Sequence, residues 1–308
     1  MLKGALKAAL EAALEAALEG ALKRGERMII VGVDGSRAGL EAAGWAAREA
    51  ALREVPLTVA HAMPRWACEA ETGRYAVVAK WMRDGGAMVL AAAEDRARRE
   101  QSKISIRTVL LPGDPRVALI EAAKEAELLV TGSHGLGGVR GLLVGSVAYG
   151  VAGHAPCDVV VVRQLPSLPR GELVAAVDGA PESRRGVLDF AFAEAELRGA
   201  SLRVVHAWSG FEPADSVDSA DKRGGRLVLR EALAGHREAH PEVDVIEEAV
   251  HGHPVEVLRQ AAEGADLLVV GSHGYGTFAG LVMGSVSQAM VHHSPCPLAV
   301  IRNRLRYP

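Results

Sequence analysis

Short apolar runs alternate with longer Ala-rich segments along residues 28–303. The first run, 29–33, contains no polar side chain, and the run 173–177 has the same character. Unbroken apolar runs of this length are typical of strands that are buried on both faces. Strands that alternate with helices predict a parallel sheet with helices on both faces, because a helix usually connects each pair of parallel strands.

The same succession of elements is expected twice. In the first half we predict strands at 29–33, 57–62, 104–110, 128–131 and 159–163, and helices at 38–53, 78–100, 115–126 and 145–153. In the second half we predict strands at 173–177, 202–207, 244–250, 267–270 and 298–302, and helices at 183–198, 218–238, 254–264 and 284–292. The predicted fold class is α/β, with two tandem five-stranded, doubly wound, Rossmann-like domains.

Whole stretches of sequence recur along with the order of elements. The stretch Ile29–Ser36 returns as Leu173–Ala180, and the stretch Gly132–Gly135 returns as Gly271–Gly274. Repetition on this scale indicates that a complete domain has been duplicated, rather than a short solenoid unit.

The domain boundaries follow from this repeat. We place the first domain at 28–163, a linker with two prolines at 164–171, and the second domain at 172–308. The remaining segment, 1–27, is predicted to be an amphipathic helix, because Ala, Leu, Glu and Lys are strong helix formers. Its leucines recur at every fourth position, namely at 2, 6, 10, 14, 18 and 22. Three interpretations stay open: an engineered or fused helix, a helix that binds a partner or a membrane surface, and an extension that packs on a sister subunit.

Net charge, cysteine spacing and the length of apolar runs argue against several classes of protein. The net charge of -3 gives no basic excess, which argues against a nucleic-acid-binding protein. Three cysteines without CxxC spacing predict neither a disulfide framework nor a zinc site, and we expect Cys157 and Cys296 to be buried free thiols. No uncharged apolar run reaches the length of a membrane span. These features predict a cytoplasmic protein.

Each repeat carries a glycine-rich loop after its fourth predicted strand. The first loop has the pattern G-x2-G-x9-G-S from Gly132 to Ser146, and the second has the same pattern from Gly271 to Ser285. Glycine lets the backbone approach a ligand closely, and a Gly-Ser pair that starts a helix can direct backbone N–H groups at an anion. The loops match neither the Walker phosphate loop nor the GxGxxG dinucleotide motif. Glycines that only make turns are the plainer alternative, which the doubled spacing disfavours.

An aspartate follows the first strand of each repeat, at Asp34 and at Asp178. The carboxyl ends of parallel strands meet at one edge of a sheet, so each aspartate and its glycine-rich loop can face the same ligand. One carboxylate per site is little support for a metal held by the protein. The sequence therefore predicts two ligand sites without metal ligands.

With these motifs, the sequence resembles the universal stress protein family over nearly all of the chain beyond residue 27. ATP-binding members of that family carry G-x2-G-x9-G-[S/T] and an aspartate at the end of the first strand. The resemblance implies that Asp34 and Asp178 lie near the adenosine moiety, and that Ala62 and Ala207 offer backbone contacts to adenine. It implies that ribose and phosphates are lined by Gly132, His134, Gly135, Gly145, Ser146 and Val147 in the first repeat, and by Gly271, His273, Gly274, Gly284, Ser285 and Val286 in the second. Members of the family pair through their last strand, so we expect a pseudo-dimer of the two repeats and a dimeric or otherwise homo-oligomeric protein.

Three functional hypotheses remain. The first is an ATP-binding regulatory protein of the stress response, in which nucleotide occupancy controls conformation or the binding of a protein partner. AMP or a cyclic nucleotide can replace ATP in this hypothesis, and Mg²⁺ can accompany ATP. The second is a slow ATP-hydrolysing or nucleotidyl-transfer enzyme of related fold; because neither loop offers a catalytic lysine, no catalytic residue is assigned and at most a weak ATPase is expected. The third is a scaffold that assembles, or binds a membrane surface, through the N-terminal helix.

The histidines near the two sites have more than one interpretation. We interpret His61 and His206, at the ends of the second strands, as loop-stabilising residues, with pH sensing as the alternative. His134 and His273 lie within the glycine-rich loops, where contact with phosphate and a simple place in the turn are equally open. Pro181 is expected to stiffen the loop that follows Asp178.

Overall fold

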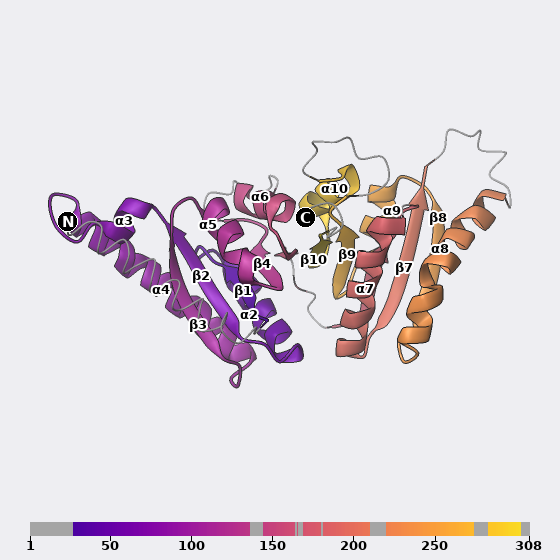
Figure 1. Ribbon diagram of the computed structural model, residues 1–308, viewed down its shortest axis with the longest axis horizontal. Helices are drawn as coiled ribbons and strands as arrows, with labels where there is room; N and C mark the ends of the chain where they lie inside the picture. Colours follow the sequence, from indigo (N-terminus) through magenta and orange to yellow (C-terminus); the bar gives the residue numbers. More distant parts are fainter. Residues whose placement is uncertain are drawn as a thin grey trace. The chain divides into compact units, whose positions relative to one another are not determined.

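The computed structural model describes residues 27–135, 144–163, 165, 169–179, 181–209, 220–273 and 283–302, and Figure 1 shows its helices and strands. Contacts within the chain divide it into two compact units. Among the described residues, the first unit holds 27–135, 145–151 and 155–157, and the second holds 144, 152–154 and everything from 158 onward. The helix predicted for 1–27 lies outside the described residues, apart from Arg27.

The first unit contains a parallel sheet with the strand order β3-β2-β1-β4. Its strands are β1 (Ile29–Gly32), β2 (Leu57–Met63), β3 (Ile106–Pro112) and β4 (Leu128–Gly132). All four residues of β1 are buried, and β1 pairs with both β2 and β4. The unbroken apolar run at the start of the first repeat is therefore an inner strand of this sheet, and it is buried as the sequence predicts.

Helices cover both faces of this sheet. They are α2 (Arg37–Leu52), α3 (Arg65–Glu69), α4 (Ala76–Glu100), α5 (Pro115–Ala122) and α6 (Ser146–His154), with a 3-10 turn at Ala123–Glu125. The register places Gly32 beside Thr131, so Gly32 and Gly132 face opposite sides of the sheet. A side chain on Gly32 would meet Leu119 of α5, whereas one on Gly132 would meet the backbone of α2. The predicted two-sided covering is confirmed.

The second unit repeats this arrangement with one additional strand. Its sheet has the order β5-β10-β9-β6-β7-β8. The strands are β5 (Asp158–Val162), β6 (Glu172–Ala176), β7 (Ser201–Trp208), β8 (Val245–His251), β9 (Leu267–Gly271) and β10 (Leu298–Ile301). The helices are α7 (Pro181–Arg198), α8 (Ala220–Ala239), α9 (Pro254–Ala261) and α10 (Ser285–His293). The pairs among β6 to β10 are parallel, so the α/β class is confirmed.

The additional strand, β5, is the last strand of the first repeat, and it pairs antiparallel with β10, the last strand of the second. Val161 lies opposite Leu298, and the Asp158 carboxylate accepts a hydrogen bond from the Arg302 N–H at 2.8 Å. Both strands are buried along their whole length. The pairing of last strands that the family resemblance implies is thus present within this one chain.

Several predicted elements need correction; among them, the helices predicted at 115–126 and 254–264 end at Ala122 and Ala261. The sequence predicts no helix between the second strand and residue 78, but this stretch contains the short helix α3. Strand β3 begins at Ile106 rather than at 104; because it lies at the edge of the sheet with Arg107 and Thr108 exposed, apolar residues do not mark its start. Helix α7 begins at Pro181 rather than at 183, since proline's fixed φ suits the first turn of a helix and its missing N–H is not needed there. Pro181 therefore starts a helix instead of stiffening a loop.

The cysteines behave as the sequence predicts. Cys157 and Cys296 are buried free thiols, and Cys68 is a half-buried free thiol. Burial raises the pKa of the Cys296 thiol to about 12, so this residue is a neutral packing group at physiological pH. Across the ranges that the structure describes, no helix is both long and apolar enough to cross a membrane.

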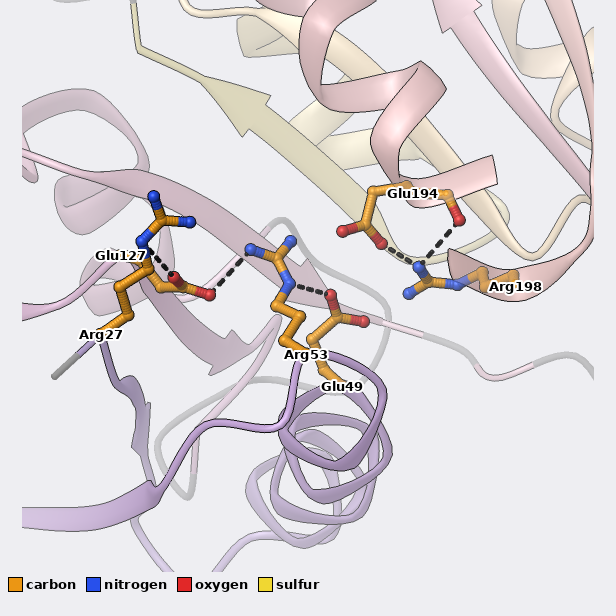
Figure 2. A network of polar contacts seen from close by, with 6 residues as sticks. All are labelled: Arg27, Glu49, Arg53, Glu127, Glu194 and Arg198. Carbon is orange, nitrogen blue, oxygen red and sulfur yellow. Dashed lines mark hydrogen bonds and ion pairs between the residues drawn. The ribbon is translucent and has the colours of Figure 1, made fainter. Parts of the chain in front are cut away.

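Buried ion pairs occupy equivalent places in the two repeats (Figure 2). In α2, Glu49 pairs with Arg53 at 2.6 Å, and Arg53 also reaches Glu127 at 3.0 Å. In α7, Glu194 pairs with Arg198 with the same spacing of four residues. The side chains of Glu49 and Glu194 are each only 1% exposed. Each repeat therefore holds a carboxylate inside the protein with a guanidinium one helical turn away.

Candidate functional site

The aspartate after β1 lies in a narrow space formed by glycine backbone. Asp34 Oδ1 accepts a hydrogen bond from the Ser36 N–H at 3.0 Å. A Cβ on Gly135 would lie 2.5 Å from Asp34 Oδ2, and one on Gly39 would lie 3.1 Å from Oδ1. The fold thus brings Asp34 and the glycine-rich loop after β4 into direct proximity, as the sequence predicts for the first repeat.

Ser36 connects the two loops that flank this aspartate. Its hydroxyl is the N-cap of α2, accepting from the Gly39 N–H at 3.1 Å and donating to the His134 carbonyl at 3.2 Å. Ser36 is not among the site residues that the sequence predicts. A serine directly before a helical pattern is a recognisable N-cap signal, but its bond to the loop after β4 depends on the folded structure.

Replacing Ser36 with alanine is expected to lower the free energy of unfolding by about 1 kcal/mol, the usual cost of losing an N-cap hydroxyl. The change also removes the bond to the His134 carbonyl, so the loop after β4 should exchange its amide hydrogens faster. Thermal unfolding and hydrogen exchange measure the two effects. The exposed Ser102→Ala substitution is the control, and equal behaviour of the two variants would contradict the assigned capping role.

The two ends of each glycine-rich loop are joined by one backbone hydrogen bond. In the first repeat, the Gly145 N–H donates to the Ser133 carbonyl at 2.7 Å. In the second repeat, the Gly284 N–H donates to the Ser272 carbonyl at 2.8 Å. Both serines are buried. The same closure therefore appears twice, although 136–143 and 274–282, including the predicted site residue Gly274, lie outside the described residues.

Both loops end at the start of a helix, as expected. Gly145 and Gly284 are the N-cap residues of α6 and α10, with extended backbone and no side-chain cap hydrogen bond. The next residues, Ser146 and Ser285, are exposed. The first backbone N–H groups of a helix have no partner within the helix, and together with the helix dipole they favour an anion. Each of these helix starts therefore suits a phosphate or carboxylate.

Comparison with known proteins identifies one family that matches the chain twice. The model of the Universal stress protein family matches residues 26–163 and, a second time, residues 170–302. The universal stress protein Rv2005c of Mycobacterium tuberculosis is 35% identical over 293 residues, which cover 91% of this chain and 98% of that protein. The universal stress protein Rv2623 of the same species is 34% identical over 288 residues, covering 90% and 97%.

The chain belongs to the universal stress protein family. Among solved structures, a universal stress protein from Archaeoglobus fulgidus shares the fold with a TM-score of 0.65 and 19% identity, over 89% of this chain and 96% of that one. The double match and the double loop together define this chain as a tandem universal stress protein.

Histidines secure the aspartate-bearing turns of this universal stress protein. His61 Nδ1 lies 2.8 Å from the Val33 carbonyl, and His206 Nδ1 lies 3.0 Å from the Val177 carbonyl. Because a carbonyl oxygen can only accept, Nδ1 is the donor in both bonds. Each histidine therefore ties the end of the second strand to the residue before Asp34 or Asp178, which is the loop-stabilising role predicted from the sequence.

Gly132 has a packing role that is independent of any ligand. A Cβ there would lie 2.6 Å from the carbonyl carbon and 2.7 Å from the carbonyl oxygen of Ala38 in α2. These are backbone atoms, so a side chain at this position would push α2 away from β4. A side chain would have more space at the equivalent Gly271 of the second repeat. A Cβ there would lie 3.1 Å from the His273 carbonyl oxygen and 3.4 Å from the Val187 side chain.

The remaining predicted residues that the structure describes lie at the carboxyl ends of strands, in the glycine-rich loops or in the first turns of helices. Ala62 and Ala207 are half-buried at the carboxyl ends of β2 and β7. The rings of His134 and His273 are held by the preceding serines, with Nδ1 at 2.8 Å from Ser133 Oγ and at 3.2 Å from Ser272 Oγ. Val147 and Val286 lie in the first turns of α6 and α10. Among the described residues, no three His, Cys, Asp or Glu side chains are grouped so that they could hold a metal ion.

Proposed function

We propose that each repeat of this universal stress protein binds one adenine nucleotide, with ATP as the first candidate. The observation that carries the proposal is the duplicated helix start at Gly145 and Gly284, each joined by a backbone hydrogen bond to the strand end that precedes it. This arrangement fixes a set of unpaired N–H donors in the geometry that phosphate requires, without any need for a basic side chain.

The aspartate explains why a nucleoside phosphate fits better than free phosphate. A carboxylate at Asp34 repels phosphate oxygens but accepts hydrogen bonds from hydroxyl or amino groups. The ribose and base of a nucleotide carry such donors, whereas phosphate at neutral pH carries few. In the first site, the phosphates would therefore accept hydrogen bonds at the start of α6, and the nucleoside would donate hydrogen bonds to Asp34.

In this proposal, nucleotide occupancy regulates the protein and the binding of a protein partner. The glycine-rich loop spans the two ends that contact the ligand, so bound nucleotide would favour one loop arrangement over others, and a partner could distinguish them. Mg²⁺ would accompany the phosphates rather than bind to a protein carboxylate cluster. Neither loop contains a lysine to neutralise charge in phosphoryl transfer, so ATP should be recovered largely intact.

The test is mass spectrometry of nucleotides released from the purified protein, followed by titration of the emptied protein with ATP, AMP and a cyclic nucleotide, with and without Mg²⁺. Gly145→Asp and Gly284→Asp address the two sites separately. Gly145 has φ −60° and its nearest atom to a new Cβ is 3.5 Å away, so aspartate fits there and can itself cap α6. Its carboxylate would occupy the phosphate position.

We expect each variant to weaken ATP binding at its own site by about 100-fold, which corresponds to about 2.8 kcal/mol. The matched control is Gly235→Asp, which adds the same charge on α8 at a position with no atom within 4 Å of a new Cβ. A wild-type protein that carries no nucleotide and takes up none when it is added would refute the proposal. Recovery of ADP and phosphate at a steady rate would instead favour the ATPase hypothesis.

A further inference from the structure

The turn that follows the first strand has a different backbone in the two repeats. Gly35 has a φ of 85°, in the left-handed region that favours glycine, and a Cβ there would lie 3.1 Å from the Val89 side chain of α4. The φ of the equivalent Gly179 lies outside that region, and no atom of the described residues lies within 4 Å of a Cβ there. Both glycines directly follow an aspartate, Asp34 or Asp178. The aspartate turns of the two repeats therefore differ in conformation.

In the first repeat, Ser36 uses its backbone and its side chain in this turn. Its N–H reaches back over the glycine and donates to Asp34 Oδ1 at 3.0 Å. Its hydroxyl accepts from the Gly39 N–H at 3.1 Å and donates to the His134 carbonyl at 3.2 Å. One half-buried serine thus bonds to the aspartate, to the first turn of α2 and to the loop after β4.

These hydrogen bonds connect the two ends of the proposed first site. Asp34 is bonded to Ser36, and Ser36 is bonded to His134. The carbonyl of the preceding Ser133 accepts from the Gly145 N–H, where α6 begins. In the proposed function, the nucleoside lies at the aspartate and the phosphates lie at this helix start. A short series of hydrogen bonds therefore holds the two ends of the ligand site in a fixed relation.

The sequence of the second repeat removes the side chain on which this connection depends. Ala180 stands two residues after Asp178, where Ser36 stands two residues after Asp34. Alanine has no hydroxyl, so its side chain can neither cap a helix nor donate a hydrogen bond to a neighbouring loop. A side-chain hydrogen bond from this position to the glycine-rich loop is therefore possible in the first repeat only.

The helix start of the second repeat has a serine bond of its own. Ser287 in α10 donates its hydroxyl to the Gly271 carbonyl at the end of β9. The offset of 139 that relates the two glycine-rich loops places Ala148 at the equivalent position of α6. Each repeat thus has one serine bond that the other cannot form. The bond of the first repeat joins the aspartate turn to the loop, whereas the bond of the second joins only a strand end to the helix start.

This difference affects how much ordering a ligand must impose on each site. A site whose parts are already in place binds its ligand more tightly, because less conformational freedom is lost on binding. A nucleotide in the proposed orientation contacts both the aspartate turn and the helix start, so it benefits from the bond between the Ser36 hydroxyl and the His134 carbonyl. One hydrogen bond of typical net strength changes an equilibrium constant by about fivefold.

We propose that the two nucleotide sites are unequal, and that Ser36 makes the first site the tighter one by holding the start of the glycine-rich loop beside Asp34. The inference rests on the proposed function, because it concerns how the two adenine-nucleotide sites differ. All the hydrogen bonds of Ser36 described above go to protein groups, so Ser36 is a positioning residue. The first site should bind ATP about fivefold more tightly than the second.

Unequal sites give the protein a state with one nucleotide bound. When the ATP concentration lies between the two dissociation constants, the first site is mostly filled and the second is mostly empty. A partner that distinguishes filled from empty loops could then recognise three states of the chain rather than two. The order of filling would be set by the serine of the first repeat and the alanine of the second.

Calorimetric titration of single-site variants of the full chain with ATP tests this proposal. Gly284→Asp leaves the first site for measurement, Gly145→Asp leaves the second, and the dissociation constant of the first should be about fivefold lower. In the Gly284→Asp background, Ser36→Ala should raise the dissociation constant about fivefold, mainly through faster dissociation. Ser36→Thr keeps a hydroxyl at the N-cap and should restore tight binding. Ser102→Ala, the same change at an exposed position, is the control and should leave binding unchanged.

The outcomes separate this inference from the proposed function. Circular dichroism establishes that each variant is folded at the temperature of the titration, so that loss of the helix cap alone does not weaken binding. No uptake of ATP by either single-site variant would refute the proposed function, and the inference with it. Equal dissociation constants, or tighter binding at the second site, would overturn the inference alone. So would a folded Ser36→Ala variant that binds ATP as before, or a Ser36→Thr variant that binds as weakly as Ser36→Ala.

Discussion

Replacing Phe192 with alanine is expected to lower the free energy of unfolding by about 3–5 kcal/mol. Phe192 is fully buried in α7 and is among the largest completely enclosed side chains of the protein. Its ring stacks on the imidazole of His236 in α8 and on that of His240 directly after α8, with centroid distances of 5.3 Å and 5.4 Å. The substitution therefore creates a cavity and removes two stacked ring contacts at once.

The same two histidines also connect α8 and the residue directly after it to α7 by polar contacts. His236 Nε2 lies 2.8 Å from Asp189 Oδ1, and His240 Nδ1 lies 2.8 Å from Glu196 Oε2. Without the ring of Phe192, both imidazoles lose the surface on which they stack and which orients them toward these carboxylates. Denaturant unfolding followed by circular dichroism measures the loss. Leu197→Ala, at an exposed position on the same helix, is the control, and a similar small change in both variants would show that the ring is not a core element.

The second large effect is expected at the buried ion pair of α2. Replacing Arg53 with methionine should lower the free energy of unfolding by about 3–5 kcal/mol, the usual cost of removing one partner of a buried pair. Burial by itself lowers the pKa of Arg53, but the neighbouring Glu49 and Glu127 carboxylates outweigh it and raise that pKa, so the guanidinium is charged at every accessible pH. Methionine keeps most of the volume and removes the charge beside the enclosed Glu49 carboxylate.

Two further variants separate charge from packing. In the Glu49→Gln, Arg53→Met double variant no unpaired carboxylate is created at Glu49, so much of the stability should return, and a double-mutant cycle gives the coupling. Arg37→Met is the matched control, since Arg37 forms a pair with Glu41 at 2.8 Å with the same spacing on the same helix but is 93% exposed. Exposed pairs contribute little, so its unfolding midpoint should not move. An Arg53→Met protein as stable as this control would contradict the assigned role.

Much of the fold can be predicted from the sequence because the apolar runs of its inner strands fit no other structure than a buried strand. Runs such as Ile29–Val33 are apolar without interruption, and only a strand that is covered on both sides buries every residue of so short a run. Strand β3 lacks this property, since it lies at an edge and the adjacent Arg107 and Thr108 are exposed, so the sequence does not locate its start. Helix α3 has five residues and no side-chain cap, which is too short for a helical period to appear.

For the candidate site, the sequence indicates which loop can bind an anion, but not the hydrogen bonds that join this loop to the rest of the site. The spacing of Gly132, Gly135 and Gly145 identifies a loop that returns to a helix start, because glycine and helix signals are local. The contact between Ser36 and the His134 carbonyl joins residues that are remote in the sequence, and no local pattern encodes it. The same holds for His61, whose ring bonds the carbonyl of Val33 only because β1 and β2 are neighbours in this register.

Because β5 and β10 pair within one chain, the two repeats can acquire different substitutions. Two separate copies that pair through their last strands form a dimer only when the protein concentration exceeds the dissociation constant of that dimer. Strands that are tethered in one chain meet at a fixed effective concentration, even when the protein is dilute. A substitution in such a homodimer would also appear on both sides at once. In the fused gene each half mutates alone, so the first repeat can carry Ser36 where the second carries Ala180, and a symmetric ancestor can become a molecule with two different halves.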